Sequence, residues 1–316
     1  MTDHSSMYRL VFPAPSVDTG DGVGPVLVHA LEGFADAGHG VKLTADHLRE
    51  SLHSELVAYF DTDSIIDYRS RRPMMTFADD QITDVDMPRL QLHVVRDNSG
   101  RPFLLLSGSE PDLRWEGFVD AVQELADRFS VSTVIGLNSI PMAIPHTRPA
   151  TLTAHGDEDL IEGLPRWGGA LKFPASASML LELRLGQAGY PALGLSVHVP
   201  HYLSQTDYPA AALKAVTALG GVAGLDLPVA ALENAAESMR AQIDDEVDGN
   251  AEVEGVVRAL ESQYDSFAAG QAEERSLLAA DEPLPSGDEL GAEFEKYLAQ
   301  HHAGDTKNPD DSTDDE

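Results

Sequence analysis

Short strand patterns alternate with helical patterns through the first 225 residues, and this alternation constrains the fold more than any other feature of the chain. Residues 26–31 and 193–199 are almost continuous apolar runs, as expected for strands covered on both faces. Residues 115–129 instead repeat apolar side chains at helical spacing. The alternation predicts an α/β domain of three layers with a mostly parallel or mixed central sheet. The predicted strands are 8–12, 26–31, 56–60, 90–95, 103–106, 133–137 and 193–199, and the predicted helices are 41–52, 115–129, 176–185 and 210–219.

The strand patterns stop after Leu225. Residues 229–247 and 253–267 predict two successive amphipathic helices, and 287–302 predicts a further short helix after a proline-containing linker at 281–287. The last residues, 303–316, offer almost no apolar side chain that could pack, so we expect a disordered acidic tail. We therefore divide the chain into an α/β domain (1–225), a helical C-terminal extension (226–302) and the tail.

Acidic residues give the chain a formal net charge of −32, and more than half of the excess lies near its end. Residues 244–316 hold 22 Asp or Glu against 4 Lys or Arg, a local net charge of −18. Such a field repels nucleic acid phosphates and anionic lipids, so we expect neither nucleic acid nor membrane as a partner. No apolar run approaches the ~18 residues of a membrane helix, and the first residues lack the pattern of a secretory signal. We expect a cytoplasmic protein.

The chain contains no cysteine, which excludes disulfides, thiolate metal sites and a Cys nucleophile. The remaining candidates for chemistry gather in four loops that follow predicted strands, where α/β sheets usually bind ligands. These loops are 32–38, 107–111, 138–149 and 200–202, and two of them contain a Pro-His dipeptide. A further arginine group lies at 69–72. The candidate ligand-binding residues are Glu32, Gly33, Asp36, Gly38, Arg69, Glu110, His146, Arg148, His201 and Tyr202.

The two Pro-His dipeptides permit two interpretations. Proline fixes its own φ and presents the next side chain in a defined direction, so each imidazole could bind an anion or act as an acid or base near neutral pH. Arg148 would add a guanidinium group suited to carboxylate or phosphate. Alternatively, these histidines and arginines hold backbone carbonyls or an interface in place, because structural ion-pair networks imitate functional sites.

Other motifs predict no cofactor and no metal site. Residues 32–38 lack the G-x-G-x-x-G spacing, and the carboxylates of Glu32 and Asp36 would repel phosphate, which favours a tight turn. Residues 194–198 approach a nucleophile elbow but have His198 in place of the second glycine, and Ser196 lies inside a strand pattern. His198 and His201 are three residues apart without an evident third ligand.

Several blocks of the sequence resemble the proteasome assembly chaperone family, of the type named after the second eukaryotic chaperone subunit. The blocks are PVLVHALEGFADAG, FDTDSIIDYRSRRP, SGSEPDLRWEGF, IPMAIPHTRP and LSVHVPHYLSQTDYP, which together run through residues 26–209. The later helical patterns and LPSGDELGAEFEKYL are similar to a longer, actinobacterial-type branch. The resemblance implies a central mixed sheet between helices, as in nucleoside phosphorylases, and a homo-oligomer, for which we expect a trimer.

The resemblance implies no catalytic residues. Some relatives dock a C-terminal hydrophobic-tyrosine-any tail into the proteasome ring, whereas this sequence ends in Asp314, Asp315 and Glu316, so that docking mode is not expected. Our first hypothesis is a non-enzymatic, homo-oligomeric protein-binding or assembly protein with a proteasome-related or other protein partner. The alternative is an enzyme or sensor for a small anionic, nucleoside- or phosphate-like ligand. The alternative requires His146 and His201 to open into one pocket, within ~10 Å of each other.

Overall fold

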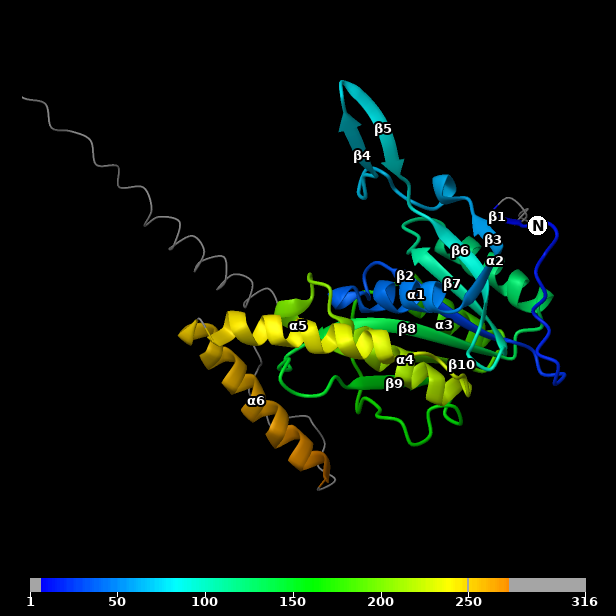
Figure 1. The fold of residues 1–316 in the computed structure, drawn as a ribbon. Coiled ribbons are helices and arrows are strands. Elements are labelled where there is room, and N and C mark those ends of the chain that lie inside the picture. The colour runs from blue at the N-terminus through cyan, green and yellow to red at the C-terminus, as the bar shows by residue number, and fades with distance from the viewer. Residues whose placement is uncertain (1–6, 249, 273–316) are drawn as a thin grey trace, which may run out of the picture. The chain divides into compact units, whose positions relative to one another are not determined.

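A mixed eight-stranded sheet forms the centre of the fold (Figure 1). The computed structural model describes residues 7–248 and 250–272. The strand order is β1-β3-β6-β7-β2-β8-β10-β9, in which β7, β2, β8 and β10 run parallel and the others pair antiparallel. The strands are β1 (Tyr8–Leu10), β2 (Val26–Glu32), β3 (His53–Phe60), β6 (Leu90–Arg96), β7 (Pro102–Ser109), β8 (Thr133–Met142), β9 (Leu152–Gly156) and β10 (Ala192–Pro200).

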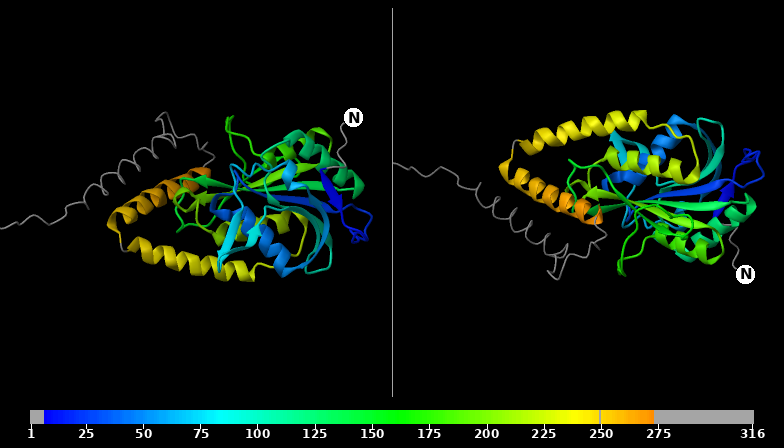
Figure 2. Two further views of the ribbon diagram at one scale, coloured as in Figure 1. Left: turned by 90° about the horizontal axis from the view of Figure 1, so that it is seen from above. Right: turned by 90° about the horizontal axis from the view of Figure 1, so that it is seen from below.

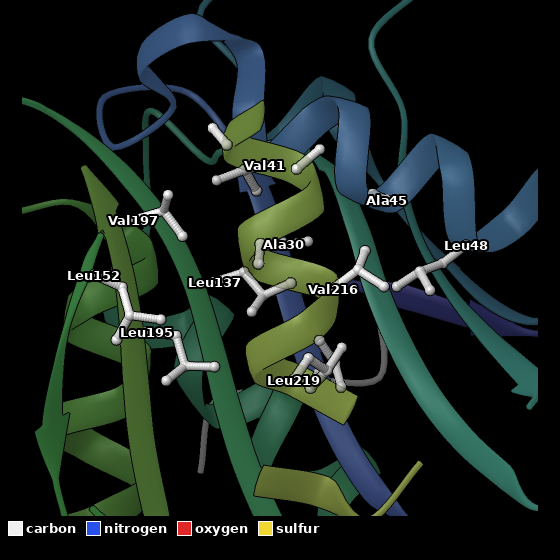
Figure 3. Packing of buried hydrophobic residues seen from close by; sticks show 14 of the residues in the cluster. Ala30, Val41, Ala45, Leu48, Leu137, Leu152, Leu195, Val197, Val216 and Leu219 are labelled. Atoms are coloured by element: carbon white, nitrogen blue, oxygen red, sulfur yellow. The ribbon is translucent and has the colours of Figure 1, made fainter. Parts of the chain in front are cut away.

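Helices cover both faces of this sheet (Figure 2). On one face lie α1 (Gly40–Ser51) and α4 (Pro209–Ala223), and on the other lie α2 (Trp115–Arg128) and α3 (Ala177–Gln187). Figure 3 shows Leu137 and Leu195 of the sheet together with Val41 of α1 and Val216 of α4 in one buried cluster. Because both faces are covered, the central strands need apolar side chains at successive positions, which is the pattern that the sequence shows.

Local signals set the helix boundaries. The Ser176 hydroxyl accepts a hydrogen bond from the backbone N–H of Met179 and caps α3. Pro209 occupies the first turn of α4, where a missing N–H costs nothing, and Gly224 ends that helix in the left-handed conformation. The helices α5 (Ala230–Asp248) and α6 (Ala251–Ala272) follow, and α5 packs against α4.

All seven predicted strands and the six predicted helices up to residue 267 are present in the structure. The sequence did not predict three further strands, β4 (Met74–Ala78), β5 (Gln81–Asp86) and β9. The edge strand β9 is short. The strands β4 and β5 form a separate two-stranded sheet, a hairpin that stands away from the central sheet (Figure 1). Four aspartates between residues 74 and 86 interrupt the apolar alternation, so this segment lacks a regular strand pattern.

Internal contacts group residues 1–269 into one compact unit and residues 270–316 into another. The predicted boundary at residue 225 stays a prediction. The predicted linker at 281–287, the helix at 287–302 and the acidic tail lie outside the described residues. Within the part of the chain that the structure describes, no helix is both long and apolar enough to cross a bilayer.

Candidate functional site

The buried Glu110 carboxylate joins two loops at the carboxyl ends of the strands. Its Oε2 accepts a hydrogen bond from the Phe34 backbone N–H at 2.7 Å, and its Oε1 accepts one from the Ala177 N–H at 2.5 Å, at the first turn of α3. The chain approaches so closely here that a Cβ on Gly33 would lie 2.0 Å from Oε2. Glu110 and Gly33 therefore fix loop geometry, and both carboxylate oxygens are occupied by backbone donors.

Asp36 and Gly38 stabilise the turn that precedes α1 and the first residues of that helix. The Asp36 side chain accepts a 2.7 Å hydrogen bond from the Val41 N–H, and burial raises the pKa of this carboxyl to about 6. Gly38 has a φ of 62°, which favours glycine, and its N–H donates to the Ser204 carbonyl at 2.7 Å. Loop 32–38 is thus the tight turn that the sequence favoured, held against the residues that follow β10.

His146 is enclosed between Tyr202 and α5. Its side chain is 1% exposed, and its backbone N–H donates to the Tyr202 hydroxyl at 2.8 Å. The same hydroxyl lies 2.7 Å from Nδ1, while Nε2 lies 3.0 Å from the Asp244 carboxylate. With the ring proton on Nε2, the tyrosine donates to Nδ1 and the imidazole donates to Asp244. Burial raises the pKa of Tyr202 to about 12, so it remains a donor at neutral pH.

Arg148 binds carboxylates of α6, as His146 binds a carboxylate of α5. Its guanidinium group binds the Asp265 carboxylate through Nε at 2.8 Å and Nη2 at 2.7 Å, and its Nη1 lies 3.1 Å from the Glu261 carboxylate. Thr147 donates to Glu261 from the neighbouring position at 2.5 Å. The loop 145–149 is therefore an interface that receives carboxylates of the two C-terminal helices. This geometry favours the interface interpretation of the Pro-His-Thr-Arg-Pro segment.

His201 does not share a pocket with His146. A cavity of about 490 Å³ beside α4 and α5 is lined by His146, Arg148 and Arg240, but His201 is not among the described residues that line it. The Tyr202 ring contacts both imidazoles edge-on, with centroid separations of 5.9 Å to His146 and 5.4 Å to His201. His201 is exposed, whereas His146 is buried. The common pocket that the small-ligand hypothesis required is not formed by these two histidines.

A second cavity, of about 440 Å³, lies at the carboxyl ends of the neighbouring parallel strands β2 and β7 and at the base of the β4–β5 hairpin. We call it the arginine cavity, because Arg49, Arg71, Arg72 and Arg89 line it together with the carboxylates of Glu32 and Asp86. Arg49 is paired with Asp46, and Arg71 with Asp112. Burial raises the pKa of Glu32. Arg69 is exposed and is not among the described lining residues.

The other two arginines of this cavity, Arg72 and Arg89, are exposed, and their guanidinium groups make no hydrogen bond or ion pair with any residue in 7–248 or 250–272. Acidic residues outnumber basic ones by 53 to 21 in the sequence, so two unpaired guanidinium groups beside one cavity are a local exception to the charge of the chain. Two such groups beside one cavity, at the carboxyl ends of parallel strands, form the best-defined candidate for an anion or carboxylate site in the described residues.

A partly buried row of polar side chains on the α3 side of the sheet has no local sequence signal. Ser196 Oγ lies 3.0 Å from His155 Nε2, and His155 Nδ1 lies 2.8 Å from the Glu182 carboxylate. His29 lies in the same layer, 3.2 Å from Ser178 Oγ, and burial lowers its pKa to about 3. The order of serine, histidine and carboxylate matches that of a nucleophilic triad, but Ser196 is 4% exposed within β10 and paired on both sides by β8 and β9. The row joins β9, β10 and α3.

The β4–β5 hairpin, which we call the arm, has one strongly apolar face. Met75 pairs with Val85 and Phe77 pairs with Ile82, and cross-strand partners share a face of a sheet. Thr83 is the extra residue of a β-bulge, and this bulge is what brings Ile82 and Val85, three positions apart, to the same face. The exposed fractions are 60% for Met75, 70% for Phe77, 64% for Ile82 and 37% for Val85.

Comparison with known proteins decides the family. The model of the PAC2 family matches residues 30–247, more than two thirds of the chain. The chain belongs to the PAC2 family. This PAC2 protein is similar to Rv2714, a Mycobacterium tuberculosis protein of unknown function, with 52% identity and a TM-score of 0.82 over 84% of this chain and 93% of that one. The family resemblance drawn from the sequence blocks is confirmed.

Two further structures extend the PAC2 comparison. A Corynebacterium glutamicum protein of unknown function is 44% identical, with a TM-score of 0.81, over 85% of this chain and 100% of that one. The Mycobacterium tuberculosis proteasome-assembly chaperone homologue Rv2125 is 26% identical, with a TM-score of 0.67, over 73% of this chain and 99% of that one. No curated protein sequence matches the chain. The relatives place this PAC2 protein in the expected actinobacterial branch.

Proposed function

We propose that this PAC2 protein is a homo-oligomeric protein-binding protein, and that its arm is the surface through which copies associate. The apolar face of the arm carries the proposal. An isolated two-stranded hairpin is marginally stable in water, because it has no layer to cover its apolar side. Four large apolar side chains on one exposed face mark a surface that another protein covers.

A second copy of the chain is the occupant that the charges favour. The arm, residues 74–86, contains four aspartates and no lysine or arginine, so a covering surface must be neutral or basic. The chain as a whole is strongly acidic, yet it keeps a basic surface at the base of the same arm, around the arginine cavity. The trimer implied by the family resemblance and a proteasome-related partner remain parts of the proposal. The latter is supported by the relative described as a proteasome-assembly chaperone homologue.

The test is the mass of the particle in solution, measured by light scattering during size-exclusion chromatography and by native mass spectrometry. We expect the unaltered chain to form an oligomer of its 34.0 kDa subunit, and the Ile82→Asp variant to run as a monomer. Leu183→Asp is the matched control, since Leu183 is an exposed leucine on α3, away from the arm. A monomeric parent protein, or an Ile82→Asp variant that keeps the full particle mass, would refute the proposal.

The arginine cavity supports a second candidate function, the binding of a small anionic ligand. Arg72 and Arg89 are the observation in its favour, and the nucleoside-phosphorylase-like fold expected from the family resemblance adds to it. A ligand that binds the folded state raises the unfolding temperature by mass action. We would therefore measure the unfolding temperature with inorganic phosphate and with nucleoside monophosphates. A shift that disappears in the double variant Arg72→Gln and Arg89→Gln would support this function, and no shift with either ligand would remove it.

A further inference from the structure

The arm is polarised in charge along its length. Its tip consists of Asp79 and Asp80, the two residues of the turn between β4 and β5. Its base is flanked by Arg72 before β4 and Arg89 after β5, both of which line the arginine cavity. Neither tip aspartate makes a side-chain hydrogen bond or ion pair with any residue that the structure describes. The exposed carboxylates and the unpaired guanidinium groups thus lie at opposite ends of one element.

Folding of a single chain does not account for the two aspartates of the tip. Both have positive φ, 47° for Asp79 and 64° for Asp80, as a two-residue hairpin turn with two left-handed positions requires. Asn-Gly or Asp-Gly meets this requirement with less strain, since glycine tolerates positive φ freely. Two adjacent carboxylates also repel each other. Two aspartates at this exposed turn thus combine backbone strain from positive φ with repulsion between their carboxylates.

The arginines at the base of the same arm cannot neutralise this tip. At a rise of about 3.4 Å per residue, the five residues of β4 separate base and tip by roughly 17 Å. The Debye length at physiological ionic strength is about 8 Å, so solvent screens the attraction over that distance. A basic partner for the tip aspartates therefore does not come from the base of the same arm. A second copy of the chain presents the complementary surface, its own arginine cavity.

We propose that the Asp79–Asp80 tip of one copy binds in the arginine cavity of a second copy, with Arg72 and Arg89 as the cationic partners. The inference rests on the proposed arm-mediated association and adds the specific contact that orients it. A guanidinium group pairs with a carboxylate through two parallel hydrogen bonds. Two such pairs, between the two tip aspartates and the two arginines, would therefore fix the direction of the arm as well as attract it. The cavity, of about 440 Å³, has the size of a typical binding pocket.

The contact joins two different surfaces, the tip of one arm and the base of another. Contacts of this type close into a ring when the rotation between copies permits it, as in the expected trimer. They also close in a two-fold pair when each arm reaches the other copy's cavity. In both arrangements Phe77 and Ile82, which lie next to the tip on the apolar face of the arm, would contact the second copy as well. The charged tip therefore orients one copy on the other, and the apolar face of the arm provides the apolar surface that association buries.

Charge reversal tests the contact without touching the core. We expect the tip variant, Asp79→Arg with Asp80→Arg, to raise the dissociation constant of the oligomer by about tenfold or more, and the cavity variant, Arg72→Glu with Arg89→Glu, to do the same. The chain that combines all four substitutions restores opposite charges across the contact. We expect it to regain most of the association, whatever the number of copies in the particle. Analytical ultracentrifugation measures all three constants.

A control pair and a salt series complete the experiment. Glu158→Arg with Asp159→Arg changes the net charge by the same amount at another pair of exposed acidic neighbours, and we expect it to leave association unchanged. Circular dichroism should show the same folded signal for every variant, since all these side chains are exposed. Raising sodium chloride from about 0.05 M to about 0.5 M should weaken association of the unaltered chain more than that of the tip variant.

The outcomes separate this inference from the proposed function. If Ile82→Asp dissociates the oligomer but both charge-reversal variants associate normally, copies associate through the arm and the tip contact is refuted. If the combined variant fails to regain association, the direct pairing of tip and cavity is also refuted. If inorganic phosphate raises the unfolding temperature through Arg72 and Arg89 while the tip variant associates normally, the cavity is a small-anion site and the inference is wrong. If the unaltered chain is monomeric, the proposed function fails first.

Discussion

Removal of the Glu110 carboxylate is the sharpest test of how the strand-end loops work. The carboxylate accepts hydrogen bonds from the backbone N–H groups of Phe34 and Ala177, and it is buried. Glu110→Ala leaves the buried Ala177 N–H and the part-buried Phe34 N–H without this acceptor. An unsatisfied buried donor costs about 1–3 kcal/mol, so the Ala177 N–H alone predicts a loss of that size, to which the Phe34 N–H adds a smaller amount. Domains are stable by only about 5–15 kcal/mol, so this loss is large.

Glu110→Gln is the matched control. The amide keeps one acceptor oxygen for the buried Ala177 N–H and turns its NH₂ group toward the part-buried Phe34 N–H, so we expect a smaller loss than with alanine. Equilibrium urea unfolding, followed by far-ultraviolet circular dichroism, measures the free energy of unfolding for each variant. Gly33→Ala probes the same contact from the other side, since the added Cβ would lie 2.0 Å from Oε2, and it should also destabilise the protein.

The result that would refute this reasoning is equally clear. If Glu110→Ala lowers the free energy of unfolding by less than about 1 kcal/mol, the two backbone donors do not depend on the carboxylate. Glu110 would then be available for a ligand, as the sequence alone suggested. If the glutamine and alanine variants lose the same amount, the charge of the carboxylate rather than its two acceptor oxygens carries the effect, and the accounting by unsatisfied donors is wrong.

Three further predictions concern other parts of the fold. Arg148→Ala should speed amide hydrogen exchange in α6 and leave exchange in α1 unchanged, as measured by mass spectrometry; equal rates in α6 would show that the ion pairs do not hold this helix. Burial lowers the pKa of His29 in the folded state to about 3, so the unfolded chain binds the proton first as the pH falls. The free energy of unfolding should therefore fall by about 1.4 kcal/mol per pH unit below a pH of about 6.5. Urea titrations at several pH values measure this dependence, and His29→Gln should remove the part of it that His29 causes. Gly194→Ala should cost about 1–3 kcal/mol, because its Cβ would lie 2.3 Å from Glu182 Oε2, whereas Gly168→Ala, with open space around it, should not lower the melting temperature.

The sequence contained enough information to predict the layers of the fold. Strands buried on both faces, such as β2 and β10, require apolar residues at successive positions, and helices such as α2 require them at a spacing of 3.6, so both patterns are visible locally. The arm was missed because its apolar face depends on a bulge. Ile82 and Val85 are three positions apart, and only the extra residue Thr83 brings them to one side.

The sequence by itself also determined where the polar residues gather, in the loops after the strands, and it led to the PAC2 family through the same blocks. Only the tertiary structure decided what those residues contact. His146 meets Asp244 from 98 positions away, and Arg148 meets Asp265 from 117 positions away. Periodicity reports which side of an element is buried, because that depends on neighbours within a turn or two. The partner of a side chain depends on how distant elements pack, and no local pattern records it.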